Sequence, residues 1–161
     1  MTDSREGSVF IIAEAGVNHN GSLARARDLV RAAADAGADA VKFQTFRAEK
    51  VAAASAPKAA YQEEAIGEGE SQLDMIRKLE LPDSAFCTIA ADCREVGIEF
   101  MSTPFDLGSL NFLVRDVGLL RLKIPSGEIT NGPFLLAAAR SGLPLVVSTG
   151  MATMEIGRAH V

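Results

Sequence analysis

Gly37-Ala38-Asp39-Ala40-Val41-Lys42-Phe43-Gln44 decides the fold of this chain. A glycine of the kind that ends a helix is followed directly by a short apolar run, and the run closes on polar residues. Such runs are typical of strands that are buried on both faces of a parallel sheet. Outward from this stretch, the same order recurs at residues 97–103, 118–124 and 142–149, and a further strand over Val9 to Ala13 opens the chain and ends at Glu14.

The segments between these strands carry helix signals. Ser22 is of a type preferred at helix N-caps, and apolar residues follow it with a helical period, namely Leu23, Ala26, Leu29, Val30 and Ala33. Asp106 is a similar cap for a second helix, whose apolar residues are Leu107, Leu110, Leu113 and Val114. Pro82 and Pro133 stand where the first turn of a helix tolerates proline. The predicted order is strand, helix, strand, a loop with helices, strand, helix, strand, helix, strand.

Strands that alternate with helices predict an α/β protein, either a (β/α) barrel or an open doubly wound sheet. No glycine-rich phosphate-binding turn follows the first strand, which argues against the dinucleotide-binding form of the open sheet. We therefore favour a (β/α) TIM-type barrel. A complete barrel takes about 250 residues, whereas this chain has 161. The sequence thus predicts a truncated barrel of about five of the eight βα units.

We expect residues 1–155 to be the N-terminal part of such a barrel and residues 156–161 to be a non-native tail. The tail, Ile156 to Val161, has no apolar helical period. It can be encoded by ATCGGAAGAGCACACGTC, a string of a widely used sequencing adapter in which a stop codon follows. The alternative is a naturally short protein that ends at Val161.

Composition and charge exclude several classes of function. The net charge is −5 with acidic and basic residues interspersed, and no basic stripe predicts a nucleic-acid partner. No stretch approaches the ~20 apolar residues of a membrane span, and the first residues lack the apolar run of a signal peptide. Cys87 and Cys93 fall on different faces of a predicted helix, which suits thiols in a reducing compartment. We expect a cytoplasmic protein without a membrane or nucleic-acid partner.

The candidate active site follows from the predicted barrel, because catalytic groups lie at the carboxyl ends of barrel strands. The polar residues at those positions are Glu14, Lys42, Gln44, Thr103, Lys123 and Ser148. Residues 46–71 form a connection much longer than the roughly 2–6 residues usual between a strand and a helix. It is either a substrate-covering element or a surface insertion.

Five motifs at the predicted strand ends resemble the N-acetylneuraminate (sialic acid) synthase family along nearly the whole chain. They are residues 12–22 (IAEAGVNHNGS), 41–45 (VKFQT), 102–105 (STPF), 123–128 (KIPSGE) and 148–151 (STGM). Each motif alone is a weak signal, but five in this order are specific. Residues 56–62 (APKAAYQ), 70–73 (ESQL) and 127–131 (GEITN) are most similar to the bacterial branch that makes N,N′-diacetyllegionaminic acid.

The resemblance implies a carbohydrate-biosynthesis transferase that condenses phosphoenolpyruvate with an N-acetylmannosamine-type sugar, giving a nonulosonic acid and phosphate. It implies phosphoenolpyruvate-binding roles for Lys42, Gln44, Thr103, Lys123, Ser126 and Ser148. Glu14 and Glu128 are the implied catalytic carboxylates, Glu14 in contact with the sugar and Glu128 moving protons. Asn18, His19 and Tyr61 belong to substrate loops in this interpretation.

The resemblance also implies a divalent metal, Mn²⁺, held by two histidines from later strands. The only histidines here are His19 and His160, and His160 lies in the expected tail. We therefore expect no metal site within these residues. The complete enzyme is expected to bind Mn²⁺ and to form a homodimer, and this shorter chain is expected to be inactive alone.

Two other functions stay open at this point. The first is a Schiff-base aldolase, which uses one lysine on a barrel strand as a nucleophile, and Lys123 is suitably placed for that role. The second is a half-barrel without catalysis that binds an anion or pairs with another chain through an exposed strand edge.

Overall fold

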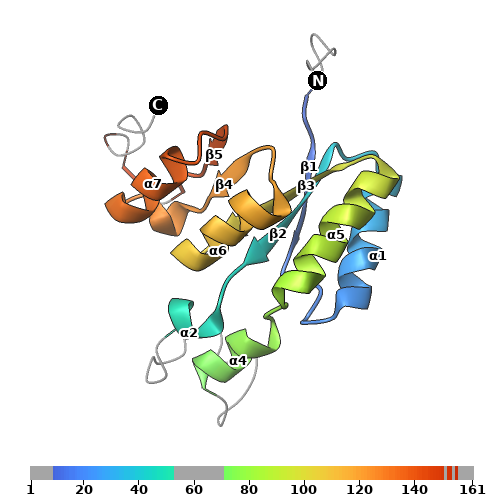
Figure 1. The fold of residues 1–161 in the computed structure, drawn as a ribbon, viewed down its shortest axis with the longest axis horizontal. Helices are drawn as coiled ribbons and strands as arrows, with labels where there is room; N and C mark the ends of the chain where they lie inside the picture. The colour runs from blue at the N-terminus through green and yellow to red at the C-terminus, as the bar shows by residue number, and fades with distance from the viewer. Residues whose placement is uncertain (1–8, 53–70, 151, 154, 156–161) are drawn as a thin grey trace.

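A computed structural model of the chain describes residues 9–52, 71–150, 152, 153 and 155. Its elements follow the predicted alternation of strands and helices (Figure 1). In chain order they are β1 (Ile12–Gly16), α1 (Leu23–Asp35), β2 (Ala40–Thr45), α2 (Ala48–Val51), α4 (Gln72–Lys78), α5 (Asp83–Val96), β3 (Glu99–Pro104), α6 (Leu107–Phe112), η1 (Leu113–Val117), β4 (Leu122–Ile124), η2 (Ser126–Glu128), α7 (Gly132–Ala139) and β5 (Leu145–Val147).

All of the strand pairs are parallel. The first sheet has the order β1-β2-β3 and the second pairs β4 with β5, and β3 contacts β4 between them. Ile12 lies opposite Ala40 at the start of the β1–β2 ladder, and Lys123 lies opposite Val146 in the β4–β5 ladder. Parallel strands joined by helices confirm the predicted α/β class.

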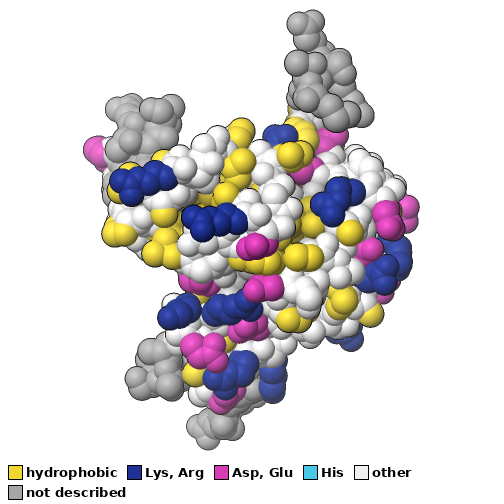
Figure 2. Space-filling model, in the orientation of Figure 1, with side chains coloured by type: hydrophobic (Ala, Val, Ile, Leu, Met, Phe, Trp, Pro, Cys, Tyr) yellow, Lys and Arg dark blue, Asp and Glu magenta, His cyan; other side chains and the backbone are white. Residues whose placement is uncertain are grey.

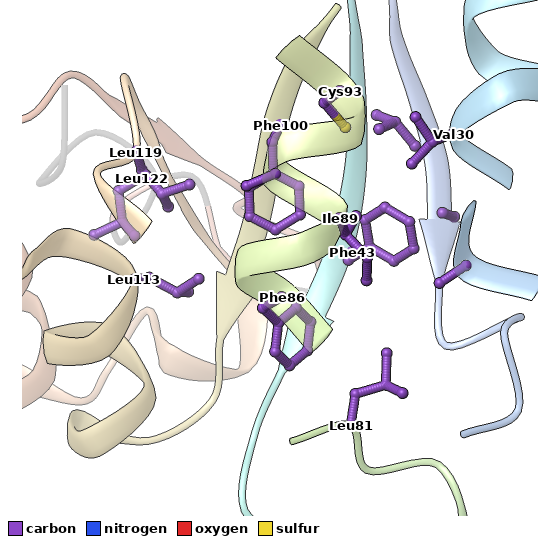
Figure 3. Close-up of a cluster of buried hydrophobic side chains, with 14 of the residues drawn as sticks. Val30, Phe43, Leu81, Phe86, Ile89, Cys93, Phe100, Leu113, Leu119 and Leu122 are labelled. Atoms are coloured by element: carbon purple, nitrogen blue, oxygen red, sulfur yellow. The ribbon is translucent and has the colours of Figure 1, made fainter. Parts of the chain in front are cut away.

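Helices α1 and α5 lie side by side over the first sheet and bury its apolar core (Figure 1). Figure 3 shows Phe43 of β2 between Val30 of α1 and Ile89 of α5, all three fully buried. Burying one such side chain contributes about 1.5–3 kcal/mol to folding. The predicted apolar stripe of the first helix is confirmed, since its buried residues are Ala26, Val30 and Ala33.

The predicted helix caps are present. Ser22 Oγ accepts a hydrogen bond from the amide of Arg25 at 3.3 Å, and Asp106 Oδ1 accepts one from the amide of Ser109 at 2.9 Å. Gly97 ends α5 with a φ of +81°, a conformation in which glycine carries no Cβ penalty. The helix predicted after Asp106 continues from α6 into the π-helical turn η1.

The first strand was predicted three residues too early. The prediction was Val9 to Ala13, whereas β1 runs from Ile12 to Gly16 and Val9 is 81% exposed. The start of β1 is set by the start of β2, because the hydrogen-bonded ladder between the two strands begins where Ile12 lies opposite Ala40. Before that point Ile11 bonds to the turn instead, its amide donating to Asp39 Oδ2 at 2.8 Å. An apolar run does not show where its partner strand begins.

Charged side chains of both signs are interspersed on the face in Figure 2, including the part over α2 and α4. In the described part of the chain, no helix is both long enough and apolar enough to cross a membrane. Cys87 and Cys93 are free thiols, the first exposed and the second buried, as their positions in the helix predicted. Burial raises the pKa of the Cys93 thiol to about 12.

Candidate active site

Alternate residues of each strand face away from α1 and α5. On β2, Val41 and Phe43 belong to the apolar core under these helices. Side chains alternate between the two faces of a strand, so Lys42 and Gln44 lie on the opposite face. The same alternation places on that face the polar residues Glu14 of β1, Thr103 of β3 and Lys123 of β4.

Glu14, Lys42 and Thr103 are in direct contact on this face. The ladder sets Glu14 opposite Lys42, and Lys42 Nζ lies 2.5 Å from Glu14 Oε2. The same ammonium donates to Thr103 Oγ1 at 3.4 Å. The Lys42 side chain is 13% exposed while that of Glu14 is 53% exposed. The carboxylate therefore lies between the largely buried lysine and solvent.

Lys123 brings a second ammonium group to the same place. It donates to Ser148 Oγ, just past β5, and to the carbonyl of Ile124 at 2.8 Å. Burial lowers the pKa of Lys123 from the usual 10.5, the positive charge of Lys42 lowers it further, and Glu14 partly opposes both. The two lysines and Glu14 thus act on one another electrostatically across the two sheets.

Gln44 and Ser126 lie near this group. Gln44 pairs with Thr103 in the β2–β3 ladder. A Cβ added to Gly16 would lie 3.2 Å from Glu14 Oε1 and 3.6 Å from Gln44 Nε2. The side-chain ends of Glu14 and Gln44 therefore both border the position above this glycine, whose φ is +54°. Ser126 lies in the turn after β4, and a Cβ on Gly150 would lie 3.6 Å from Ser126 Oγ.

Glu128 lies at the end of the same turn, η2. Its Oε2 accepts a hydrogen bond from Asn131 Nδ2 at 2.6 Å. Asn131 in turn caps α7, since its Oδ1 accepts from the amide of Phe134 at 3.2 Å. Glu128 is thus oriented by the first turn of α7, and no contact joins it to Glu14 or Lys42 within the described residues.

The predicted substrate-loop residues have different surroundings. Asn18 is exposed on the β1–α1 loop. His19 is 1% exposed and lies against Phe43, with its Nδ1 accepting from the amide of Gly21 at 3.1 Å. Burial lowers the pKa of His19, and its contacts fit the shaping of the loop. Tyr61 lies outside the described residues, as do residues 53–70 of the long connection.

A charged network beside the site had no recognisable sequence signal. Arg47 follows β2 and contacts Glu80 at 3.2 Å and Asp83 at 2.5 Å. Its amide donates to Asp106 Oδ2 at 3.1 Å, and the amide of Ala48 donates to Glu80 at 2.9 Å. The network joins the loops that follow β2 and β3 to the start of α5. Its partners are far apart in the sequence, so spacing alone could not reveal them.

The described residues do not fit a resident metal ion. They contain no group of three or more His, Cys, Asp and Glu side chains that could hold one. His19 is engaged with the backbone of its own loop. The metal that the resemblance implies therefore finds no set of ligands in this part of the chain.

This arrangement is suited to an anionic substrate. Two partly buried lysines lie beside one partly exposed carboxylate, and the hydroxyl groups of Thr103 and Ser148 accept hydrogen bonds from the lysines. Lysine ammonium groups stabilise phosphate and carboxylate groups as point charges. Glu14, beside them, can accept or deliver a proton.

Comparison with known proteins shows the family to which the chain belongs. Residues 29–160 match the NeuB family. This chain belongs to the NeuB family. It is 50% identical over 94% of its length to N,N′-diacetyllegionaminic acid synthase of Legionella pneumophila, and 49% identical over 90% to the synthase of the same name from Campylobacter jejuni. The NeuB-family chain spans 42% and 43% of the lengths of those two relatives.

Solved structures of relatives share the fold. The crystal structure of N-acetylneuraminic acid (sialic acid) synthetase from Leptospira borgpetersenii, in complex with citrate, superposes with a TM-score of 0.77 at 36% identity. That match covers 94% of this chain and 48% of the other. The spore coat polysaccharide biosynthesis protein spsE of Bacillus subtilis superposes with a TM-score of 0.73 at 35% identity, over 96% of this chain and 40% of its own.

Proposed function

We propose that this NeuB-family chain is the N-terminal part of a synthase that condenses phosphoenolpyruvate with an N-acetylmannosamine-type sugar. The observation that carries the proposal is the grouping of Lys42, Lys123 and Glu14 on one face of parallel strands. The proposal is supported by the 50% identity of the chain to an N,N′-diacetyllegionaminic acid synthase. The alternation of strands and helices supports a (β/α) barrel, of which this chain supplies about five of eight units.

Phosphoenolpyruvate carries a phosphate and a carboxylate, and the two lysines are the groups that bind them. Lys42 and Lys123 supply the charge, while Thr103, Ser126 and Ser148 supply hydroxyl groups that hydrogen-bond to the same anion. Gln44 adds an amide beside Glu14. Holding the anion in place before the sugar arrives removes part of the entropic barrier to a two-substrate reaction.

The chemistry needs one new carbon–carbon bond and one molecule of water. The methylene carbon of phosphoenolpyruvate attacks the open-chain aldehyde of the sugar, and the aldehyde oxygen takes a proton. Water adds to the oxocarbenium-like carbon, loses a proton, and the bond from that carbon to the phosphate oxygen breaks. Glu14 and Glu128 are the carboxylates that we assign to these proton movements, Glu14 beside the sugar and Glu128 near the aldehyde or the attacking water.

Several features of the complete enzyme belong to the same proposal. We assign the divalent metal, Mn²⁺, to side chains beyond this chain, where it would polarise the aldehyde. We also assign to the complete enzyme a homodimer, a cytoplasmic location, and a substrate of the N,N′-diacetyllegionaminate branch. Support for the branch comes from the two relatives of that name, which are 50% and 49% identical to this chain.

The test is a phosphate-release assay on the complete synthase with phosphoenolpyruvate and each amino sugar. Lys42→Met and Lys123→Met are expected to abolish phosphoenolpyruvate binding in calorimetry. Glu14→Gln and Glu128→Gln are expected to retain binding and to lower kcat by about 10²–10⁴-fold. Near-normal turnover of a Gln variant would remove that carboxylate from the catalytic residues. Absence of phosphate release with every sugar would refute the proposed function.

A Schiff-base aldolase is the second candidate, and the lowered pKa of Lys123 is the observation that favours it. A lysine with a lowered pKa is a better nucleophile near neutral pH. Borohydride with substrate would then leave a covalent adduct on Lys123, detectable by mass spectrometry. The synthase forms no imine, so we expect the mass of the chain to be unchanged.

A further inference from the structure

His19 is the one fully buried residue in the loop that leads from β1 to α1. The other residues of positions 17–22 are exposed or partly exposed, whereas His19 is 1% exposed. Its ring packs against the ring of Phe43 on β2, with 6.1 Å between the two centroids. The loop is therefore anchored to the sheet through this imidazole, while the adjacent Asn18 stays exposed.

His19 also holds the tight turn that ends the loop. Asn20 and Gly21 have positive φ angles of +49° and +72°, and the amide of Ser22 donates to the carbonyl of His19 at 2.9 Å. Asn-Gly is a preferred pair for turns with positive φ at both central residues. The imidazole adds a second hydrogen bond to the same turn, because the amide of Gly21 donates to His19 Nδ1 at 3.1 Å.

This second hydrogen bond fixes where the imidazole carries its proton. A ring nitrogen that accepts an N–H has no hydrogen of its own, so the neutral ring holds its proton on Nε2. Within the described residues, His19 Nε2 is buried without a hydrogen-bond partner. Protonation would place a hydrogen on Nδ1, facing the amide of Gly21, and would bury a charge in the same place. The turn fits the neutral imidazole and not the imidazolium.

The charged side chains on the surrounding elements do not favour the protonated ring. Glu14 and Lys42 pair with each other, Glu80 pairs with a guanidinium, and Arg25 and Lys78 are exposed. Among the described residues, burial is the cause that lowers the pKa of the imidazole from 6.5, and none of these charges shifts it. The folded chain therefore keeps the ring neutral below pH 6.5, until the lowered pKa is reached.

The loop that His19 anchors begins at the candidate active site. It leaves β1 directly after Glu14, where the register with β2 shifts between Glu14 and Gly16. The amide of Asn18 then donates to the carbonyl of Ala15 at 3.0 Å. A change in the turn at His19 would thus reach Asn18 and Glu14 through consecutive hydrogen-bonded turns.

We propose that neutral His19 is a positioning residue of the proposed synthase, which holds the β1–α1 loop so that Glu14 and Asn18 meet the sugar. The inference rests on the proposed function and deepens it by making the sugar side of the site depend on one proton. Lys42 and Lys123 lie on other strands, so the binding of phosphoenolpyruvate does not depend on this loop.

Two substitutions in the complete synthase separate positioning from packing. His19→Asn places an amide oxygen near the position of Nδ1, so it keeps an acceptor for Gly21 but fills less space. His19→Phe keeps a ring against Phe43 but has no acceptor. At pH 8 we expect His19→Phe to lower kcat/KM for the sugar about tenfold and His19→Asn to lower it less. Calorimetry should show unchanged phosphoenolpyruvate affinity in both. Packing alone would reverse the order of the two variants.

The pH profile is the second readout. In the unaltered enzyme, kcat/KM for the sugar should fall as pH drops through the pKa of His19, which lies below 6.5, because the imidazolium releases the turn. Asparagine does not titrate, so this part of the fall should disappear in His19→Asn. An NMR titration of the labelled imidazole, identified by its contact with Phe43, should give the same pKa and a proton on Nε2 above it.

The outcomes separate the inference from the proposed function. A fall at acid pH that persists unchanged in His19→Asn, or full activity of His19→Phe, would overturn the inference and leave the proposed function intact. Where neither variant folds, the NMR titration of the unaltered enzyme decides, and a proton on Nδ1 or a pKa different from the kinetic one would overturn the inference. Absence of phosphate release from the unaltered enzyme would instead refute the proposed function, and the inference with it.

Discussion

Burial, and after it the nearby ammonium group of Lys42, explain why Lys123 differs from an ordinary surface lysine. Its pKa is lowered by burial first and by the charge of Lys42 second, with Glu14 opposing. Between the pKa of folded Lys123 and 10.5, the unfolded chain binds more protons than the folded one, so stability rises with pH in that window. Below the folded pKa the cost of the buried charge is fully present. An anion that binds here removes part of that cost, so binding and charge are coupled.

A titration of Lys123 tests this coupling. Lys42→Met removes the neighbouring positive charge, so the pKa of Lys123 should move back toward 10.5. Phosphoenolpyruvate should raise the same pKa, and its affinity should therefore fall as pH rises through that pKa. The measurement is an NMR titration of isotope-labelled lysine side chains, with the Lys123 signal assigned from the Lys123→Met variant.

Lys50→Met serves as the control for this titration, because Lys50 is exposed on α2. The Lys50→Met substitution should leave the pKa of Lys123 unchanged. If Lys42→Met also left it unchanged, the two ammonium groups would not act on one another, and the argument for one shared anion site would lose its electrostatic support.

At the scale of elements, Arg47 joins the loops that carry the site. It contacts Glu80 and Asp83, and its amide bonds to Asp106. Arg47→Met should lower the free energy of unfolding by about 1–2 kcal/mol, because a partly buried guanidinium with two carboxylate partners contributes more than an exposed pair. Chemical denaturation measures the loss.

The matched control is Arg31→Met, because Arg31 pairs with Asp28 across one exposed turn of α1. That change should cost at most about 0.5 kcal/mol. Equal losses in the Arg31 and Arg47 variants would mean that the Arg47 network contributes no more than a surface ion pair.

Gly21 fixes the distance between the β1–α1 loop and α4. Its φ is +72°, and a Cβ there would lie 2.3 Å from the carbonyl oxygen of Lys78. Gly37 has a φ of +78° with open space around the same position. Gly37→Ala should therefore cost about 1–2 kcal/mol of stability from backbone conformation alone. Gly21→Ala should lower the stability by about 1–3 kcal/mol more, because the backbone at Gly21 or at Lys78 must move to make room for the Cβ. Equal losses in denaturation would show that the loop adapts freely.

The sequence predicted those elements whose signals are local. The cap at Ser22 and the apolar stripe through Ala26 and Val30 depend only on residues within one helix. The structure confirms both. The start of β1 was wrong because it depends on where β2 begins. Arg47 was missed because its partners come from distant segments.

The sequence indicated which residues form the candidate site, but not which of them are in contact. Polar residues at the strand ends were sufficient to select Lys42, Lys123 and Glu14, because parallel strands bring their carboxyl ends together. Which of them touch depends on register and on rotamers. The 2.5 Å contact between Lys42 and Glu14, and the position of Glu14 and Gln44 on either side of the space above Gly16, could be seen only in the three-dimensional structure.

At the scale of the whole molecule, the outer strands lack second neighbours. Among the described residues, β1 pairs with β2 alone and β5 pairs with β4 alone. A strand with one unpaired edge offers backbone donors and acceptors to another strand. In a closed barrel every strand has two neighbours, so the proposed barrel would need hydrogen bonds between β3 and β4, which lie in contact, and further strands beside β1 and β5.

The gene is expected to continue in frame past the codon for Glu155, through further strand and helix segments with two histidines at strand ends. The family match runs to residue 160 and so does not by itself set the boundary. Sequencing the source DNA across these codons measures it directly. A continued frame would supply the partners that β1 and β5 lack and the metal ligands absent from the described residues. A genuine stop after Val161 would leave the two lysines without a metal beside them, and the anion-binding half-barrel would then replace the synthase as the better account of this chain.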